Sequence, residues 1–178
     1  MRTFVAVFPP QSVRKALFRV VRDLPASKDF RLISPEKLHL TLRFLGDVTK
    51  DNLGSVTQAL EPLRGRHEPF EVSTSGFGAF PSEKRARILW VGVGEGSEPL
   101  REVARSVEDL LESAGFGREE RPFVPHLTLG RARSRRAKLD EARLYPPALR
   151  FTVSGVDLVE SVPGAGGVTY SVLETYSF

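Results

Sequence analysis

Hydrophobic positions along this chain recur with two spacings, one typical of strands and the other of helices. Short runs that are alternating or continuously apolar predict strands over 3–8, 38–45, 70–80, 87–93, 126–132, 149–161 and 168–176. Apolar residues three and four positions apart predict a helix after Pro9-Pro10 and further helices over 49–63, 98–113 and 134–144. Strands and helices that mix in this way indicate an α+β fold.

One tetrapeptide, His-Leu-Thr-Leu, occurs twice, at 39–42 and at 126–129, and both copies lie in predicted strands. Side chains alternate along a strand, so each histidine shares one face with its threonine while the leucines occupy the other face. A rise of about 3.3 Å per residue separates histidine from threonine by about 7 Å, which suits a small anion. Two such strands side by side would surround one pocket with two imidazoles and two hydroxyls.

The two copies use His39 and His126, and the chain has 3 histidines in all. An imidazole titrates at a pKa of about 6.5, so one can act as a base and the other as an acid near neutral pH. This pair therefore predicts acid–base chemistry on a phosphate without a metal. Zinc prefers three or four ligands, and no third ligand follows at a recognisable spacing. The remaining histidine, His67, lies in a polar connection, and we expect it at the surface.

Each copy occupies a similar place in its half of the chain, which suggests an old duplication with a pseudo-two-fold relation. The 178 residues, 40% hydrophobic and 27% charged, are typical of a soluble globular protein. The absence of cysteine excludes disulfides and thiolate chemistry. The apolar run at 4–8 is too short for a signal peptide or a membrane span, so we expect a cytoplasmic protein without a membrane partner.

The net charge of +4 mildly favours polyanionic partners, and the basic residues are unevenly distributed. A cluster directly follows the second tetrapeptide and comprises Arg131, Arg133, Arg135, Arg136 and Lys138. Such a cluster is often a solvated helix start, but its position beside a candidate site favours contact with a phosphate backbone. Arg131 lies at the exit of the same strand, where a guanidinium can bind phosphate as a bidentate donor.

Aromatic residues on or near the predicted strands offer surfaces on which a nucleic-acid base could stack. They are Phe4, Phe8, Phe44 and Tyr170. Most strand aromatics belong to a hydrophobic core, and that remains the alternative for each of these.

Four stretches together resemble a known family over essentially the whole chain. They are 2–6, the first tetrapeptide with its flanks (38–46), the second with its flanks (122–131), and the closing segments 158–161 and 167–170. On these residues the chain resembles the 2H phosphoesterase superfamily. Within it, the match is to the bacterial and archaeal RNA 2′,3′-cyclic phosphodiesterases, historically called 2′–5′ RNA ligases.

The resemblance implies a single bilobal domain over 1–178, α+β, with two antiparallel sheets facing across a central cleft and helices on the outside. It implies hydrolysis of a terminal 2′,3′-cyclic phosphate on RNA to a 2′-phosphate, with no metal and no nucleotide cofactor. The RNA could be a tRNA half or another cleaved RNA. We expect the protein to act as a monomer.

By the same analogy, catalysis falls to His126 as the base and His39 as the acid. The hydroxyls of Thr41 and Thr128 would donate hydrogen bonds to the phosphate oxygens, bonds that strengthen as charge develops in the transition state. The further expected substrate contacts are Arg131, Phe4 and Tyr170.

Three alternatives stay open at the level of sequence. Run in reverse, the same site would join a cyclic phosphate end to a 5′-hydroxyl without ATP and form a 2′–5′ linkage. A sheet-based module could bind RNA or nucleotides without catalysis. A phosphodiesterase could also act on small metabolites such as ADP-ribose cyclic phosphates, without the salt dependence expected of an RNA contact.

Overall fold

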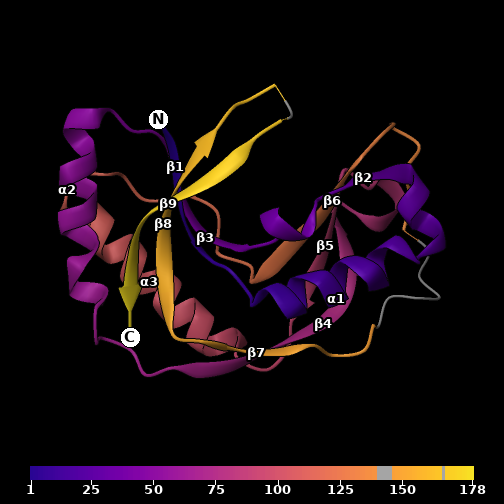
Figure 1. The fold of residues 1–178 in the computed structure, drawn as a ribbon, viewed down its shortest axis with the longest axis horizontal. Coiled ribbons are helices and arrows are strands. Elements are labelled where there is room, and N and C mark those ends of the chain that lie inside the picture. The colour runs from indigo at the N-terminus through magenta and orange to yellow at the C-terminus, as the bar shows by residue number, and fades with distance from the viewer. Residues whose placement is uncertain (140–145, 166) are drawn as a thin grey trace.

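The structure is a computed structural model that describes residues 1–139, 146–165 and 167–178 (Figure 1). The α-helices are α1 (Gln11–Arg22), α2 (Lys50–Leu60) and α3 (Ser97–Ser113). The strands are β1 (Arg2–Val7), β2 (Phe30–Leu32), β3 (Leu40–Asp47), β4 (Phe70–Phe80), β5 (Ile88–Val93), β6 (His126–Ala132), β7 (Arg150–Val153), β8 (Gly155–Val162) and β9 (Thr169–Ser177). Short 3₁₀ helices are η1 (Pro25–Asp29), η2 (Pro35–Lys37), η3 (Glu61–Leu63) and η4 (Glu83–Arg85).

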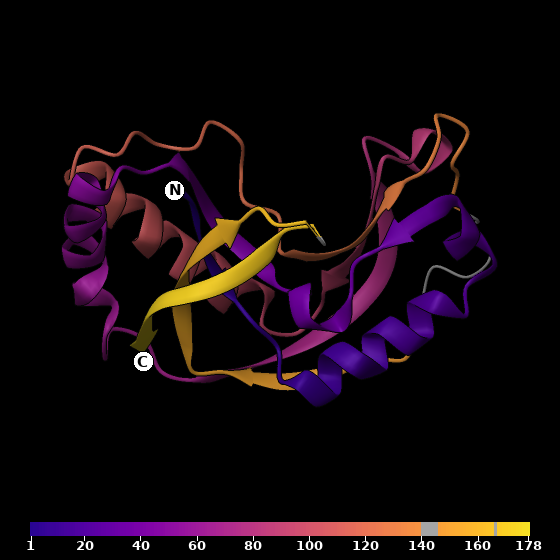
Figure 2. The ribbon, with the colours of Figure 1, turned by 45° about the horizontal axis from the view of Figure 1, so that its top comes forward.

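The strands of the described residues form one antiparallel sheet in the order β7-β4-β5-β6-β3-β1-β8-β9, with β2 paired to β6 beside this path. This sheet is strongly curled, as Figure 2 shows. The family resemblance implied two separate sheets, but the described strands form two arms of one sheet. The arms meet where β3 and β6 share a single residue pair, Leu40 with Leu127, so the two strands diverge from that point.

The helices cover the sheet with one apolar side each. Buried side chains of α3 follow the helical repeat, at Leu100, Val103, Val107 and Leu111. The Thr49 hydroxyl caps α2 by accepting a hydrogen bond from the Asn52 amide at 3.2 Å. In Figures 1 and 2, α2 and α3 lie side by side at one end of the molecule, whereas α1 runs along the other arm. No helix of the described residues is long and apolar enough to cross a membrane.

The long strand predicted over 149–161 is two strands that belong to opposite arms. β7 pairs with β4, and β8 pairs with β1. The buried positions reveal the break, because they are Phe151 and Val153 in β7 but Val156 and Leu158 at the start of β8. A change of parity means that the side chains would switch faces of a continuous strand.

The basic helix predicted over 134–144 is absent over 134–139, and the rest of that range lies outside the described residues. The backbone of this segment instead bonds to η4 and its neighbour. The Ala86 amide donates to the Ala137 carbonyl at 3.2 Å, and the Leu139 amide donates to the Glu83 carbonyl at 3.0 Å. These bonds replace those that a helix would have made within itself.

Candidate active site

The centre of the site lies where the two arms of the sheet join. Leu40 on β3 faces Leu127 on β6, and both leucines are buried in the core. Because side chains alternate along a strand, the histidine and threonine of each tetrapeptide lie on the opposite, inner face. The structure therefore brings the two motifs together on one face, as the repeat predicted.

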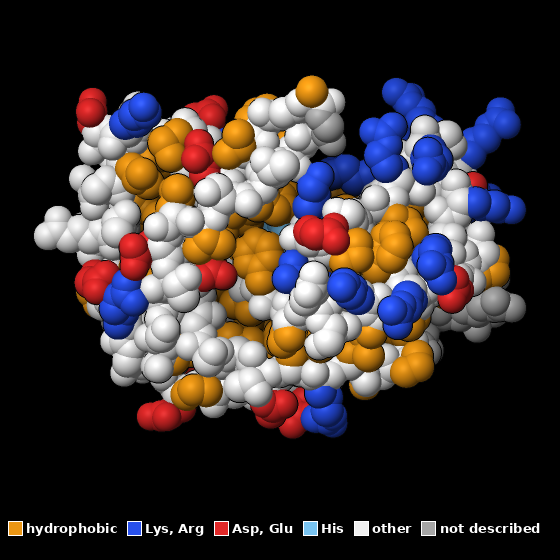
Figure 3. All heavy atoms as spheres, viewed as in Figure 1, with side chains coloured by type: hydrophobic (Ala, Val, Ile, Leu, Met, Phe, Trp, Pro, Cys, Tyr) orange, Lys and Arg blue, Asp and Glu red, His pale blue; other side chains and the backbone are white. Residues whose placement is uncertain are grey.

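The antiparallel register sets how these four side chains are arranged. Extending the antiparallel register by one residue on each side of the Leu40–Leu127 pair sets His39 toward Thr128 and Thr41 toward His126. The two histidines therefore occupy one diagonal of a four-residue group and the two threonines the other. All four side chains are partly accessible, and in Figure 3 a histidine is visible at the bottom of a depression lined with hydrophobic side chains.

A backbone carbonyl two residues earlier orients each imidazole. Nδ1 of His39 lies 2.7 Å from the Lys37 carbonyl oxygen, and Nδ1 of His126 lies 2.6 Å from that of Val124. A carbonyl oxygen only accepts hydrogen bonds, so both Nδ1 atoms must carry a proton and donate it. The neutral tautomer that remains has an unprotonated Nε2 in both rings, which is the atom left for chemistry.

Burial lowers the pKa of both imidazoles below its ordinary value. The positive charge of a protonated His126 lowers the pKa of His39 further, so the two rings interact electrostatically. The hydrogen bonds to the Lys37 and Val124 carbonyls oppose these shifts in part. Both shifts favour the neutral imidazole over the imidazolium.

Aromatic rings surround His39 on the inner face of its arm. Its ring centroid lies 4.9 Å from that of Phe4, 5.3 Å from that of Phe8 and 5.1 Å from that of Tyr170. Phe4 is only 3% exposed, so it supports the imidazole and has little surface to offer a base, contrary to the stacking role expected for it. Tyr170 is partly accessible, and Phe44 is 61% exposed.

Two aromatic residues that the sequence did not single out flank the other histidine. The His126 ring lies 5.2 Å from Phe80 and 6.2 Å from Trp90. Trp90 lies directly across from Thr128 and covers Gly78, where a Cβ atom would lie 2.1 Å from the indole. The only signal in the sequence was that the one tryptophan of the chain stands in a strand.

Arg131 lies farther along β6, exposed, and faces Ile88 on one neighbour and Arg31 on the other. Burial raises the pKa of the Tyr170 phenol, and the positive charge of Arg131 partly offsets that effect. Tyr170 lies against the His39 ring, and Arg131 lies five residues beyond His126 on the same strand. The role of both residues as substrate contacts stays a prediction.

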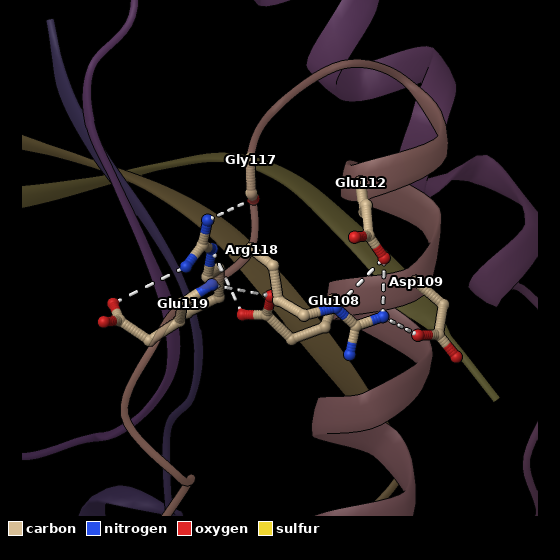
Figure 4. A network of polar contacts seen from close by, with 7 residues as sticks. Glu108, Asp109, Glu112, Gly117, Arg118 and Glu119 are labelled. Carbon is tan, nitrogen blue, oxygen red and sulfur yellow. Dashed lines mark hydrogen bonds and ion pairs between the residues drawn. The ribbon is translucent and has the colours of Figure 1, made fainter.

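A buried arginine ties the strand of the first motif to the segment that leads into the second. Arg43 on β3 donates to the Gly117 carbonyl at 2.6 Å and lies 3.2 Å from Glu108 of α3 and 3.5 Å from Glu119. Figure 4 shows this network together with Arg118, which bonds to Asp109 and Glu112 on the exposed side of α3. The loop before β6 is thus anchored to β3 and α3.

His67 is not the plain surface residue that its polar surroundings predicted. Its Nε2 lies 3.1 Å from the Ser106 hydroxyl, and its ring packs 5.2 Å from that of Phe178. These contacts give it a structural role. Across the described residues, no group of three or more histidine or carboxylate side chains is arranged to hold a metal ion.

The chain belongs to the 2′-5′ RNA ligase superfamily, whose sequence profile matches residues 9–164. Over nearly its full length it is homologous to RNA 2′,3′-cyclic phosphodiesterases. The protein of that name from Methanothermobacter thermautotrophicus is 34% identical over 183 residues, covering 99% of this chain and 98% of the relative.

Solved structures show the same fold. TT0787 of Thermus thermophilus superposes with a TM-score of 0.80 at 29% identity, covering 99% of this chain and 97% of the other. Escherichia coli LigT, solved in complex with 3′-AMP, superposes with a TM-score of 0.83 over 99% of this chain and 97% of its own. Its identity of 22% supports the fold alone.

Proposed function

We propose that this protein hydrolyses the 2′,3′-cyclic phosphate at the end of an RNA to a 2′-phosphate, without a metal ion. One observation carries the proposal: two imidazoles, each oriented through Nδ1 and with no hydrogen bond from Nε2 to the described residues, share one face with two threonine hydroxyls beside the Leu40–Leu127 pair. That arrangement provides a base, an acid and donors for the phosphate oxygens. Membership of the 2′-5′ RNA ligase superfamily and homology to cyclic phosphodiesterases support the same substrate class.

In this mechanism a water molecule attacks the phosphorus atom, and the bond from phosphorus to the 3′-oxygen breaks. His126 Nε2 takes the proton of the water, while protonated Nε2 of His39 gives a proton to the departing 3′-oxygen. The products are a 2′-phosphate and a 3′-hydroxyl, and the proton balance of the pair is then restored through solvent. Near-symmetry of the site also suits the reverse reaction, in which an RNA 5′-hydroxyl replaces water.

The hydroxyls of Thr41 and Thr128 lie on the second diagonal and, in this proposal, donate to the non-bridging phosphate oxygens. Among the described residues, neither hydroxyl forms a hydrogen bond with another protein group, so both are available to a ligand. Arg131 would add a charged donor, and Tyr170 an aromatic edge for the terminal nucleotide. Phe4 is assigned to hold the His39 ring. Since both motifs belong to one chain, a monomer contains a complete site.

The test is incubation with a short RNA that ends in a 2′,3′-cyclic phosphate, in the presence of EDTA. Wild type should form a 2′-phosphate end, and His39→Ala and His126→Ala should abolish it. His67→Gln is the matched control, because glutamine can still bond to Ser106 and the residue has no part in the site. Hydrolysis that persists in both active-site variants would refute the proposal, and ligated products would identify the reverse reaction.

A second substrate separates the two histidine roles. When sulfur replaces the 3′-oxygen, the leaving group departs without protonation, so the acid becomes dispensable. His39→Ala should then regain activity while His126→Ala should not. The opposite pattern would exchange the two roles.

A further inference from the structure

Two arginine-bearing segments, far apart in sequence, are fastened together at the end of the arm that carries β6. The first segment runs from η4 up to β5 and contains Arg85 and Arg87. The second runs from Ala132, the last residue of β6, through the following connection and contains Arg135. Backbone hydrogen bonds join them: Ala132 to Arg87 at 2.8 Å, Ala86 to Ala137 at 3.2 Å and Leu139 to Glu83 at 3.0 Å.

A hollow opens between these segments, lined by Pro81, Arg85, Arg87 and Arg135. In Figure 3, Lys and Arg side chains gather over the end of the molecule that contains β2 and β6. Three like charges around one hollow repel one another, and an anion placed between them would remove that repulsion.

These three arginines differ from others in how their charge is balanced. Within the described residues, no carboxylate forms an ion pair with any of the three, although Arg43, Arg64 and Arg118 each pair with two carboxylates. Their neighbour Arg133 is used structurally, since its Nε donates to the Phe30 carbonyl at 3.2 Å. The basic cluster after the second motif therefore has separate functions at separate positions.

Two residues that line the hollow directly adjoin, in sequence, residues of the proposed reaction centre. Phe80, whose ring touches that of His126, immediately precedes the lining residue Pro81. On the next strand, Ile88 pairs with both Phe80 and Arg131, and Arg87 lies one residue beyond. A strand of RNA whose cyclic end is held at His126 has only to pass Phe80 to reach the hollow.

We propose that this hollow binds the phosphodiester backbone of the nucleotides 5′ to the cyclic end, so that the preferred substrate is an oligonucleotide rather than a mononucleotide. The inference rests on the proposed function and adds a second anion site to it. Guanidinium groups suit this role because they bind phosphate oxygens through paired N–H donors without reading the base.

The experiment compares kcat/KM for a 2′,3′-cyclic mononucleotide and for an eight-nucleotide RNA with the same 3′ end, at several salt concentrations. Arg85→Gln and Arg135→Gln should each lower the ratio of octamer to mononucleotide kcat/KM by about threefold to tenfold. Each should also flatten the salt dependence of the octamer by about 0.7 in log–log slope, the value for one phosphate contact on a single strand. Arg136→Gln is the matched control, because Arg136 is exposed in the same basic cluster but does not line the hollow.

An unchanged ratio in Arg85→Gln and Arg135→Gln would overturn the proposal. An equal loss of this ratio in Arg136→Gln would also overturn the proposal. That result would mean that the basic cluster attracts RNA through its overall positive charge and not through a defined site. Affinity for an octamer that already ends in a 2′-phosphate, measured by fluorescence anisotropy, tests the hollow independently of turnover. Absence of hydrolysis of both the octamer and the mononucleotide by wild type would instead refute the proposed function, and the anisotropy comparison of the same variants would still decide on the hollow.

Discussion

Replacement of Arg43 by methionine should destabilise the protein far more than replacement of an average surface residue. The Arg43 side chain is 10% exposed, and its partner Glu108 is 15% exposed. The substitution keeps much of the aliphatic stem but leaves the Glu108 carboxylate without a counter-charge and the Gly117 carbonyl without its donor. Breaking a buried ion pair costs about 3–5 kcal/mol, so we expect a loss of about 2–4 kcal/mol for this slightly accessible pair.

The assay is thermal and urea unfolding followed by circular dichroism. For a chain of this size, a loss of about 3 kcal/mol in the free energy of unfolding corresponds to a fall in Tm of about 6–12 °C. The urea m-value should not change, because the same surface is exposed on unfolding.

Arg118→Met is the matched comparison, since Arg118 also joins α3 to the same loop but is 49% exposed. Its ion pairs are screened by water, so the variant should unfold close to wild type. Adding Glu108→Leu to Arg43→Met should recover part of the lost stability, because the stranded carboxylate is removed. If Arg43→Met were as stable as Arg118→Met, the buried pair would not stabilise this junction and the reasoning would fail.

Three further outcomes follow from the site. Burial lowers the pKa of His39 and His126 from 6.5. Because kcat/KM reports the free enzyme, kcat/KM should peak below pH 6.5 and fall about tenfold per pH unit on the alkaline side. The measurement is kcat/KM over a series of pH values. Thr128→Val should lower kcat by about 10- to 100-fold with little change in Tm, measured by steady-state kinetics and thermal unfolding. Gly78→Ala should lower the free energy of unfolding by about 1–3 kcal/mol in urea titrations, because its Cβ atom would overlap the Trp90 ring.

The meeting of the two motifs could be predicted because the signal was both rare and periodic. Each motif alternates apolar and polar residues, and together they contain two of the chain's 3 histidines. The exact pairing was not predictable, since the match of Leu40 with Leu127 depends on how the whole sheet curls. Local sequence specifies the faces of a strand but not which strand lies next to it.

Element boundaries failed where local pattern and tertiary context disagreed. The run 149–161 reads as one apolar strand, yet its two parts join opposite arms of the sheet. The segment 134–139 has charges and spacing typical of a helix, but its backbone groups bond to the turn at 83–86 instead. In both places, long-range hydrogen bonds decided the structure, and a single sequence contains no direct record of them.

Aromatic residues were the least predictable part of the site. The register of β4 and β5 places Phe80 and Trp90 on one face of the sheet. Alternation in the sequence shows neither this register nor whether that face lies on the inside or the outside of the curl. Phe4 illustrates the converse, because it lies on the expected face and is nevertheless covered by its neighbours. Only the three-dimensional path of the sheet distinguishes a ring that supports an imidazole from one that meets a ligand.

The hydrogen bond from each Nδ1 to a main-chain carbonyl has a consequence for how such sites vary through evolution. Every residue type, proline included, supplies a carbonyl oxygen, so the side chains at Lys37 and Val124 can change while the imidazole tautomer is maintained. A search that requires an acidic partner for each catalytic histidine would therefore overlook this site. It would also miss a related protein that keeps the two tetrapeptides but has different side chains at the residues around them.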